Sequence, residues 1–174
     1  KISSAKNEMI DEIGYEKYAH MDFEKVVQEI YVKYQKILKS NNCIDFDDLL
    51  TLPIKLFEKY PEILRSYQEK FKYVFIDEYQ DTNTVQYILS KMISARYRNI
   101  CVVGDIDQSI YSFRNADYRN IMNFEKDYKD CKTILLEQNY RSTKNILNAA
   151  NNVIKNNVLR KEKNLWSLND EGDP

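Results

Sequence analysis

Residues 71–81 read FKYVFIDEYQD, an apolar run that passes directly into two adjacent carboxylates, Asp77 and Glu78. Aromatic and β-branched residues in succession are typical of a strand that is buried on both faces, as in a parallel sheet. The two carboxylates then lie at the carboxyl end of the strand, which is the edge where open α/β sheets bind ligands. Taken alone, the pair has a second interpretation, because carboxylates often cap the following helix or face water.

Two later apolar runs have the same form. Residues 100–103, ICVV, end in Gly-Asp and lead to Asp107 and Gln108, and residues 133–136, TILL, lead to Glu137. Each run is followed by a pattern that is typical of a helix. Three parallel strands that all release polar residues at their carboxyl ends predict a single site at one edge of a sheet.

The rest of the chain is predicted to be helical. Apolar residues recur at three- and four-residue spacing in the segments 23–38, 46–57, 62–70, 85–93, 121–124 and 146–154. Asp22, Asp45 and the run Asp81-Thr82-Asn83 are suited to cap the helices that follow them, and Pro61 suits a first helical position. Pro53 is expected to bend or break the second helix. We therefore predict a mixed α/β chain that is mostly helical and contains a partial parallel sheet.

Composition limits the possible classes of protein. The 174 residues include 26 basic and 27 acidic side chains, so no overall basic charge indicates nucleic acid, and such binding would need a local groove. No window is long and apolar enough to cross a bilayer, and the first residues lack the apolar core of a signal peptide. We predict a soluble, cytoplasmic protein that makes no membrane contact. The charged run at 160–163 is predicted to be solvated.

A phosphate-binding loop of the form G-x-x-x-x-G-K-[ST] is absent from the sequence. Such a loop needs two glycines and a lysine before Ser or Thr. The chain has only Gly14, Gly104 and Gly172, and none of them is followed by Lys-Ser or Lys-Thr. The chain therefore lacks a cradle for a triphosphate.

Three longer stretches resemble motifs II, III and IV of superfamily 1 DNA helicases, and most closely the branch formed by UvrD, PcrA and Rep. They are DEYQDTN at 77–83, VGDIDQSIYSFR at 103–114 and LEQNYRS at 136–142. The likeness extends to ISSAKN at 2–7, DFDDL at 45–49 and KNLW at 163–166, and so covers essentially the whole chain. It implies a P-loop-type, RecA-like sheet.

The resemblance also implies three parts. Residues 1–44 correspond to the helical end of a 1B-like subdomain, and residues 45–140 to the second half of a 1A-like ATP-binding subdomain. Residues 141–174 correspond to the entry into a 2A-like subdomain. The phosphate-binding loop of the family belongs to a segment that precedes these motifs, so the chain on its own is expected to be inactive.

The resemblance assigns roles in ATP hydrolysis to five residues. Asp77 and Glu78 are expected to hold Mg²⁺, and Glu78 is also expected to orient the attacking water. Gln108 corresponds to a sensor of the γ-phosphate, Arg141 to a finger-like arginine, and Tyr140 to the aromatic ring that stacks on the base of ATP. From the residues alone, Gln108 could instead cap a turn, Tyr140 could pack in a seam, and Arg141 could pair with a carboxylate.

The DNA-binding residues implied by the resemblance are Tyr111, Phe113 and Arg114. Bases of single-stranded DNA present sequence-independent faces that aromatic rings can stack on. Tyr111 and Phe113 are two positions apart and would share a face only in an extended segment, and core packing is the alternative. Relatives usually have Trp where this chain has Phe113, and Gly where it has Asn115. Asn tolerates positive φ better than most residues, so we expect the turn to survive.

The function implied by the resemblance is that of an ATP-dependent 3′-5′ DNA helicase or translocase. Its cofactors would be ATP and Mg²⁺, and its substrates single-stranded DNA and junctions of single- and double-stranded DNA. Proteins of DNA repair or replication are possible partners. Two alternatives stay open: a subunit of a helicase-nuclease of the RecB or AddA type, and a degenerate, non-catalytic helicase-like module that binds DNA.

Overall fold

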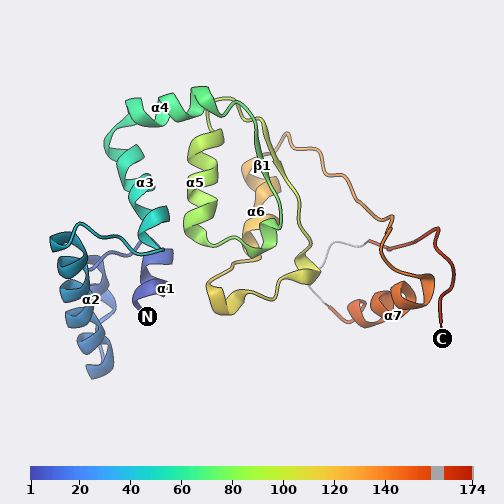
Figure 1. The fold of residues 1–174 in the computed structure, drawn as a ribbon, viewed down its shortest axis with the longest axis horizontal. Coiled ribbons are helices and arrows are strands. Elements are labelled where there is room, and N and C mark those ends of the chain that lie inside the picture. The colour runs from blue at the N-terminus through green and yellow to red at the C-terminus, as the bar shows by residue number, and fades with distance from the viewer. Residues whose placement is uncertain (158–162, 174) are drawn as a thin grey trace.

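The computed structural model describes residues 1–157 and 163–173. Figure 1 shows an elongated arrangement, with the N-terminal helices at one end and the last helix at the other. The helices and strands are α1 (Ile2–Asn7), α2 (Asp22–Ser40), α3 (Asp48–Lys59), α4 (Pro61–Lys70), β1 (Val74–Ile76), α5 (Thr84–Ser94), β2 (Ile100–Val102), α6 (Arg119–Asp127) and α7 (Lys144–Ile154). Short 3-10 helices lie at Gly14–Tyr18, Tyr79–Asp81, Ile106–Gln108 and Ser112–Arg114. The predicted mostly helical α/β class is confirmed. No helix among these residues has the length and apolar character needed to cross a membrane.

The two strands β1 and β2 pair in parallel, as predicted, with Phe75 opposite Cys101. Helix α5 forms the crossover between them, so both strands end at the same edge of the sheet. The predicted third strand at 133–136 is wrong, because that segment has no regular structure. A strand needs a neighbour for its backbone groups. Within the described ranges this segment has no strand beside it, and it runs as an extended connection between α6 and the C-terminal part (Figure 1).

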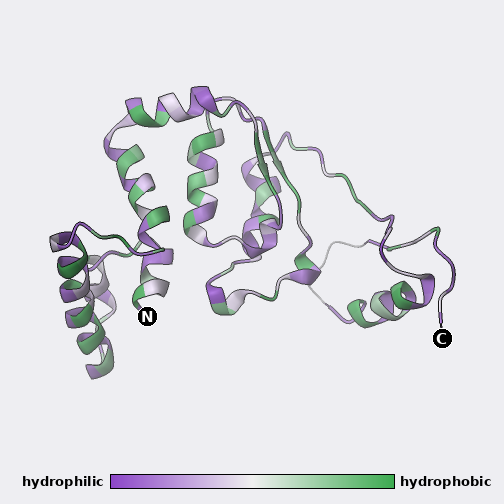
Figure 2. Cartoon of the chain, in the orientation of Figure 1, coloured by the Kyte–Doolittle hydropathy of each residue, from purple (hydrophilic) through white to green (hydrophobic). Residues whose placement is uncertain are grey.

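Only one face of this sheet is covered by the described residues. Ile76 and Val102 pack against an aromatic cluster that includes Tyr79 and Phe124. On the other face, Phe75 is 76% exposed, and its register partner Cys101 is also exposed. The prediction of burial on both faces is therefore wrong here, because the packing partners of the sheet come from α5 and α6 on one side. Figure 2 shows both strands coloured as hydrophobic.

The boundaries of α4 and α5 follow the local sequence signals. The predicted cap at Asp22 is wrong, because Asp22 is the first residue of α2 and the N-cap position before it is Met21, with no side-chain cap hydrogen bond. Asn83 caps α5 with a full capping box, in which its Oδ1 accepts from the backbone N of Gln86 at 2.8 Å. Pro61 is the first residue of α4, as predicted. Pro53, in contrast, does not break α3, which is continuous through it. The packing of α3 against α4 and α5 outweighs the one backbone hydrogen bond that proline removes.

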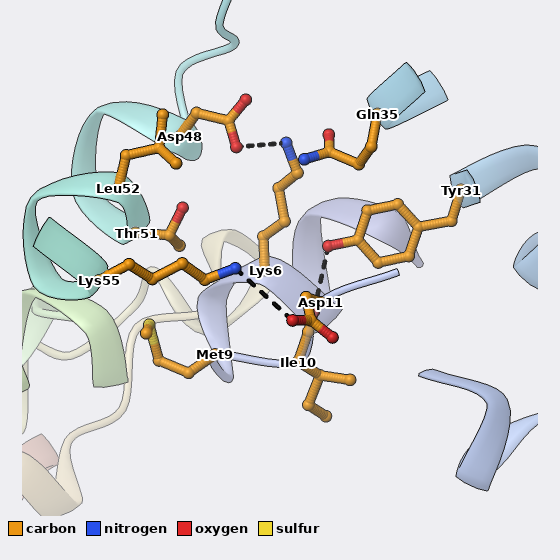
Figure 3. A pocket seen from close by; sticks show the side chains of 10 residues that line it. All are labelled: Lys6, Met9, Ile10, Asp11, Tyr31, Gln35, Asp48, Thr51, Leu52 and Lys55. Carbon is orange, nitrogen blue, oxygen red and sulfur yellow. Dashed lines mark hydrogen bonds and ion pairs between the residues drawn. The ribbon is translucent and has the colours of Figure 1, made fainter. Parts of the chain in front are cut away.

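A buried ion-pair network joins α1 to the start of α3. Lys6 is only 3% exposed, and its Nζ lies 2.7 Å from both Asp45 Oδ2 and Asp48 Oδ1; Figure 3 shows the bond to Asp48. Asp45 and Asp48 also accept hydrogen bonds from each other's backbone N, at 2.8 and 3.2 Å. Asp45 therefore accepts from the N–H of the first residue of α3, as expected of a capping side chain, although the N-cap position itself is Asp47. Asp45 and Asp48 also balance the charge of Lys6.

The neighbouring residue extends this network to α5. The Nδ2 of Asn7 donates to Asp47 Oδ1 at 2.8 Å, and its Oδ1 accepts from Asn83 Nδ2 at 2.5 Å. Tyr34 on α2 donates to Asp45 Oδ2 at 2.8 Å. Burial alone would raise the pKa of Asp45, but the hydrogen bonds from Lys6, from the Asp48 backbone and from Tyr34 outweigh it and hold that pKa below its usual range.

Replacing Lys6 by Met should strongly destabilise the chain. The substitution roughly keeps the volume but leaves the buried Asp48 carboxylate and the half-buried Asp45 carboxylate side by side without a cation. We expect the free energy of unfolding at neutral pH to fall by about 3–5 kcal/mol, as when one partner of a buried pair is removed. Urea unfolding followed by circular dichroism measures this. Lys25→Met is the matched control, because Lys25 pairs with Asp22 on the surface at 3.5 Å and should matter little.

The destabilisation should also depend on pH in a defined direction. In the unchanged chain the pKa of Asp45 is lowered, so its contribution is present at neutral pH and is lost as the pH falls below about 4. In Lys6→Met, acidification removes the negative charge that is left without a cation. The difference between the two proteins should therefore shrink on acidification. A difference that stays constant as the pH falls from about 4 to about 2 would contradict the ion-pair assignment.

Candidate functional site

The turn after β1 carries both predicted carboxylates at the carboxyl end of the strand. Glu78 has φ 50° and ψ 43°, a left-handed conformation that is strained for a residue with a side chain. Hydrogen bonds on both sides hold it there. The N of Tyr79 donates to Val103 O at 2.9 Å, and the N of Asp81 donates to Glu78 O at 2.9 Å. The strain is therefore maintained by the end of the neighbouring strand.

Asp77 and Glu78 are exposed and line an open groove together with Asp81 and Thr82. The backbone N of Glu78 donates to Asp77 Oδ1 at 2.9 Å. In the part of the chain that the structure describes, no cluster of three or more candidate metal ligands is found. Mg²⁺ is commonly bound by only one or two carboxylates together with substrate phosphates, so this pair fits such an ion.

Gln80 is a central residue of this site that the sequence analysis did not identify. Its side chain is 1% exposed. Its Nε2 donates to Glu78 Oε2 at 2.8 Å and more weakly to Asp81 Oδ2 at 3.3 Å, while its Oε1 accepts from the backbone N of Asp105 at 3.0 Å. The sequence does carry a signal for Gln80, which is its position between Glu78 and Asp81. An amide that lies between two carboxylates can donate to both.

Asp105, at the end of β2, forms several polar contacts. Its carboxylate accepts hydrogen bonds from Gln108 Nε2 at 2.9 Å and from the N of Asp107 at 3.0 Å, and it forms an ion pair with Lys163. Burial would raise the pKa of Asp105, but the bonds from Lys163 and Gln108 outweigh it and hold the pKa below its usual range. The exposed Gln108 thus bonds to the side chain of Asp105, the residue that caps the 3-10 turn Ile106–Gln108.

Lys163 was predicted to be solvated, which is wrong. Its side chain is 19% exposed and also lies 3.5 Å from Asp107 Oδ2. Tertiary structure places Lys163 there, because the C-terminal segment returns to the carboxyl end of β2. The other members of the predicted solvated run, 160–162, lie outside the described residues.

Tyr140 and Arg141 lie in the C-terminal part. Next to them, Gln138 forms an isolated parallel bridge with Trp166. The Tyr140 ring is 76% exposed, and its OH donates to Gln138 Oε1 at 2.9 Å, so the ring is not packed between elements of the described chain. Arg141 is exposed, and its guanidinium has no ion pair within the described ranges. Among the residues that the structure describes, no hydrogen bond or ion pair joins Tyr140 or Arg141 to Glu78.

The three predicted DNA-binding residues form one cluster. The rings of Tyr111 and Phe113 lie 5.8 Å apart, tilted by 48°. The Arg114 guanidinium lies over both rings, at 5.3 and 5.7 Å from their centroids. The expectation that only an extended segment brings the rings together is wrong, because the 3-10 turn at Ser112–Arg114 does so. Phe113 is 76% exposed, so it does not belong to the core that the described residues form.

The turn that carries this cluster closes through Asn115. Asn115 has φ 64° and ψ 19°, so the expected positive φ is confirmed. Its backbone N donates to Ser112 O at 3.0 Å, and the next residue, Ala116, donates to Tyr111 O at 3.2 Å. Asparagine thus adopts a conformation that glycine would reach with less strain.

Comparison with protein families identifies the class of protein to which this fold and site belong. The model of the UvrD/REP helicase N-terminal domain matches residues 1–129, and that of the UvrD-like helicase C-terminal domain matches residues 134–174. The chain belongs to the UvrD/REP helicase family.

Individual relatives are similar to almost the whole chain. The ATP-dependent DNA helicase PcrA of Bacillus subtilis is 57% identical over 171 residues, which is 98% of this chain and 23% of that protein. PcrA of Staphylococcus aureus is 53% identical and PcrA of Staphylococcus epidermidis 54% identical, each over 172 residues, 99% of this chain and 24% of the relative. The chain thus spans about a quarter of the length of these curated relatives.

Substitutions at Asn115 should reveal the strain of its turn. Because of the positive φ, Asn115→Gly should be neutral or stabilising, whereas Asn115→Ala should be less stable than Asn115→Gly by about 1–2 kcal/mol. Asn123 in α6 is the matched control, where helix propensity predicts the reverse order, with Gly about 1 kcal/mol worse than Ala. Thermal and urea unfolding measure both pairs. The same order at both positions would contradict a strained Asn115.

Proposed function

We propose that this chain is part of an ATP-dependent DNA helicase that translocates 3′ to 5′ on single-stranded DNA. One observation carries the proposal: Asp77 and Glu78 stand at the carboxyl end of β1, beside the end of β2 that bears Asp105 and Gln108. This is where an α/β sheet of this type binds nucleotide. Family membership and the similarity to PcrA helicases support it.

In the proposed reaction, Asp77 and Glu78 would provide carboxylate oxygens for Mg²⁺, and the ion would neutralise charge on the phosphates of ATP. Glu78 also accepts a hydrogen bond from the attacking water and takes up its proton. For this task the groove beside the strained turn leaves the Glu78 carboxylate open to solvent. A strained, fixed conformation at a residue of this kind is consistent with a catalytic role.

Three further residues are proposed to act on the nucleotide. Gln108 contacts the γ-phosphate, for which its side chain would exchange the bond to Asp105 for one to the phosphate. Tyr140 offers an exposed ring for the base, and Arg141 an exposed guanidinium for the transferred phosphoryl group. Tyr140 and Arg141 approach Glu78 only if the C-terminal part closes towards the sheet, so we propose that nucleotide binding involves such a closure.

For DNA, we propose that Tyr111 and Phe113 stack on bases of single-stranded DNA, including the single strand at a junction with duplex. Arg114 supports both rings by cation–π contacts and is available to a phosphate. The high exposure of the Phe113 ring favours this role over core packing. The chain has no net basic charge, so this local cluster is needed to bind an anion.

The remaining proposals concern the subdomains of the protein, its location in the cell and its protein partners. The three-part division at 1–44, 45–140 and 141–174 agrees with the separate N-terminal core around Tyr31 and the sheet-covering core around Tyr79. A cytoplasmic location and contacts with DNA repair or replication proteins are proposed from the family. Neither the helicase-nuclease nor the degenerate-module alternative gains support from the comparisons.

The experiment that tests the proposed function uses the full-length parent protein with ATP, magnesium and single-stranded DNA. Glu78→Gln keeps the shape of the side chain but cannot take up a proton. We expect nearly unchanged ATP binding and a fall in kcat of about 10²-fold or more. Phosphate release measures this, with Glu69→Gln as the control on exposed α4. Unaltered turnover in Glu78→Gln would contradict the assignment, and a parent without DNA-stimulated hydrolysis would contradict the function.

A second experiment tests the DNA contact. Phe113→Ala in the parent should weaken single-stranded DNA binding by about 1–3 kcal/mol, the cost of one stacking ring. The salt dependence should stay the same, because stacking neutralises no phosphate, whereas Arg114→Ala should flatten it. Phe113→Trp should preserve or tighten binding, and Phe23→Ala, an exposed ring on α2, should have no effect.

Titrations at several salt concentrations, with thermal melts of each variant, separate this role from packing. A destabilised Phe113→Ala protein with unaltered DNA affinity would contradict the stacking role. Phe113→Trp that binds normally and melts normally would agree with an exposed platform.

A further inference from the structure

We propose that Gln80 is the positioning residue that holds the Glu78 carboxylate in its working orientation and ties it to the end of β2. The inference rests on the proposed function, because it concerns the residue that takes up the proton. The Glu78 side chain is exposed and has several rotatable bonds, so by itself it would sample several rotamers. A buried donor that fixes one rotamer removes this freedom before the reaction.

The contacts of Gln80 use every hydrogen-bonding group of its amide. The two hydrogens of Nε2 face carboxylates, at 2.8 Å for Glu78 and 3.3 Å for Asp81. The Oε1 faces the backbone N–H of Asp105 at 3.0 Å. The reversed amide would place its oxygen against two carboxylates and its NH₂ against another donor, so only one orientation satisfies all three partners. The side chain of Gln80 is thereby fixed, and Glu78 Oε2 with it.

The backbone beside the Gln80 amide leaves space for it. A Cβ atom at Gly104 would lie 2.5 Å from the Oε1 of Gln80, which is closer than such contacts allow. Glycine at this position therefore leaves room for the amide to reach the N–H of Asp105. The same carboxamide thus connects the turn that bears Glu78 with the segment that bears Gln108.

A purely structural role for Gln80 would be to fill space and satisfy buried polar groups. This role predicts lower stability after substitution and an unchanged kcat for the molecules that remain folded. A positioning role predicts a lower kcat with little change in KM for ATP, and a loss that depends on Glu78. The two roles can therefore be separated by kinetics measured on folded protein.

The test compares three variants of the full-length parent with ATP, magnesium and single-stranded DNA. Gln80→Met keeps the volume and removes all three bonds. Gln80→Glu keeps the acceptor for Asp105 but turns a carboxylate towards Glu78. Gly104→Ala displaces the amide without removing it. We expect each to lower kcat by about 10-fold or more, with KM for ATP within about twofold, as for the loss of a group that orients a catalytic side chain.

A double-mutant cycle then asks whether Gln80 acts through Glu78. In the Glu78→Gln protein, Gln80→Met should change kcat by less than about twofold, because nothing remains to be positioned. Gln68→Met is the matched control, since Gln68 on α4 donates only to the backbone O of Met92, at 2.7 Å. It should leave kcat unchanged in both backgrounds.

The outcomes separate this inference from the proposed function. If Glu78→Gln lowers kcat as expected while all folded Gln80 and Gly104 variants keep the kcat of the parent, the positioning role is overturned and the function stands. Fully additive losses in the cycle also overturn it. If the parent shows no DNA-stimulated hydrolysis, the function fails and the inference with it. Should Gln80→Met not fold, as thermal melts would show, Gln80→Glu and Gly104→Ala decide the question.

Discussion

The parallel pairing of β1 with β2 is the constraint on which the site depends. The pairing continues past the ends of the strands, where Val103 N donates to Ile76 O at 2.8 Å and Tyr79 N donates to Val103 O at 2.9 Å. These bonds bring the turn with Asp77 and Glu78 against the segment that begins at Asp105. In a parallel sheet both segments leave at the same edge, so residues far apart in sequence come together without a long loop.

The sequence predicted those elements whose signals are local. The two strands, the cap at Asn83 and the proline that starts α4 each depend on a few neighbouring residues, and all are present. The third strand at 133–136 failed because an apolar run becomes a strand only when another strand pairs with it. The open face at Phe75 has the same cause, since burial is a property of the packing partners and not of the run itself.

The contacts that organise the site could not be read from the sequence. Gln80 bonds to Asp105, which is 25 positions away, and Lys163 reaches Asp105 across 58 positions. No periodicity or cap rule links such residues, because their proximity follows from the path of the whole chain. The residue types at the site were predicted from the motifs, whereas their partners required the tertiary structure. For the same reason Gln108 was anticipated as a site residue, but not its bond to Asp105.

Polar networks also join the parts of the chain that hydrophobic packing leaves separate. The N-terminal core around Tyr31 and the core around Tyr79 share no buried side chain. Between them lie Lys6 with its two carboxylates, and Asn7 with its bond to the cap of α5. Apolar contacts tolerate sliding, whereas a buried ion pair is satisfied in only one register and is costly in every other. The ion pairs therefore fix α1 relative to the start of α3, and the bond between Asn7 and Asn83 links α1 to the cap of α5. Helix α5 begins directly after the turn that bears Glu78. The geometry of that turn is thus held from two sides, by β2 through Gln80 and by the N-terminal helices through Asn83.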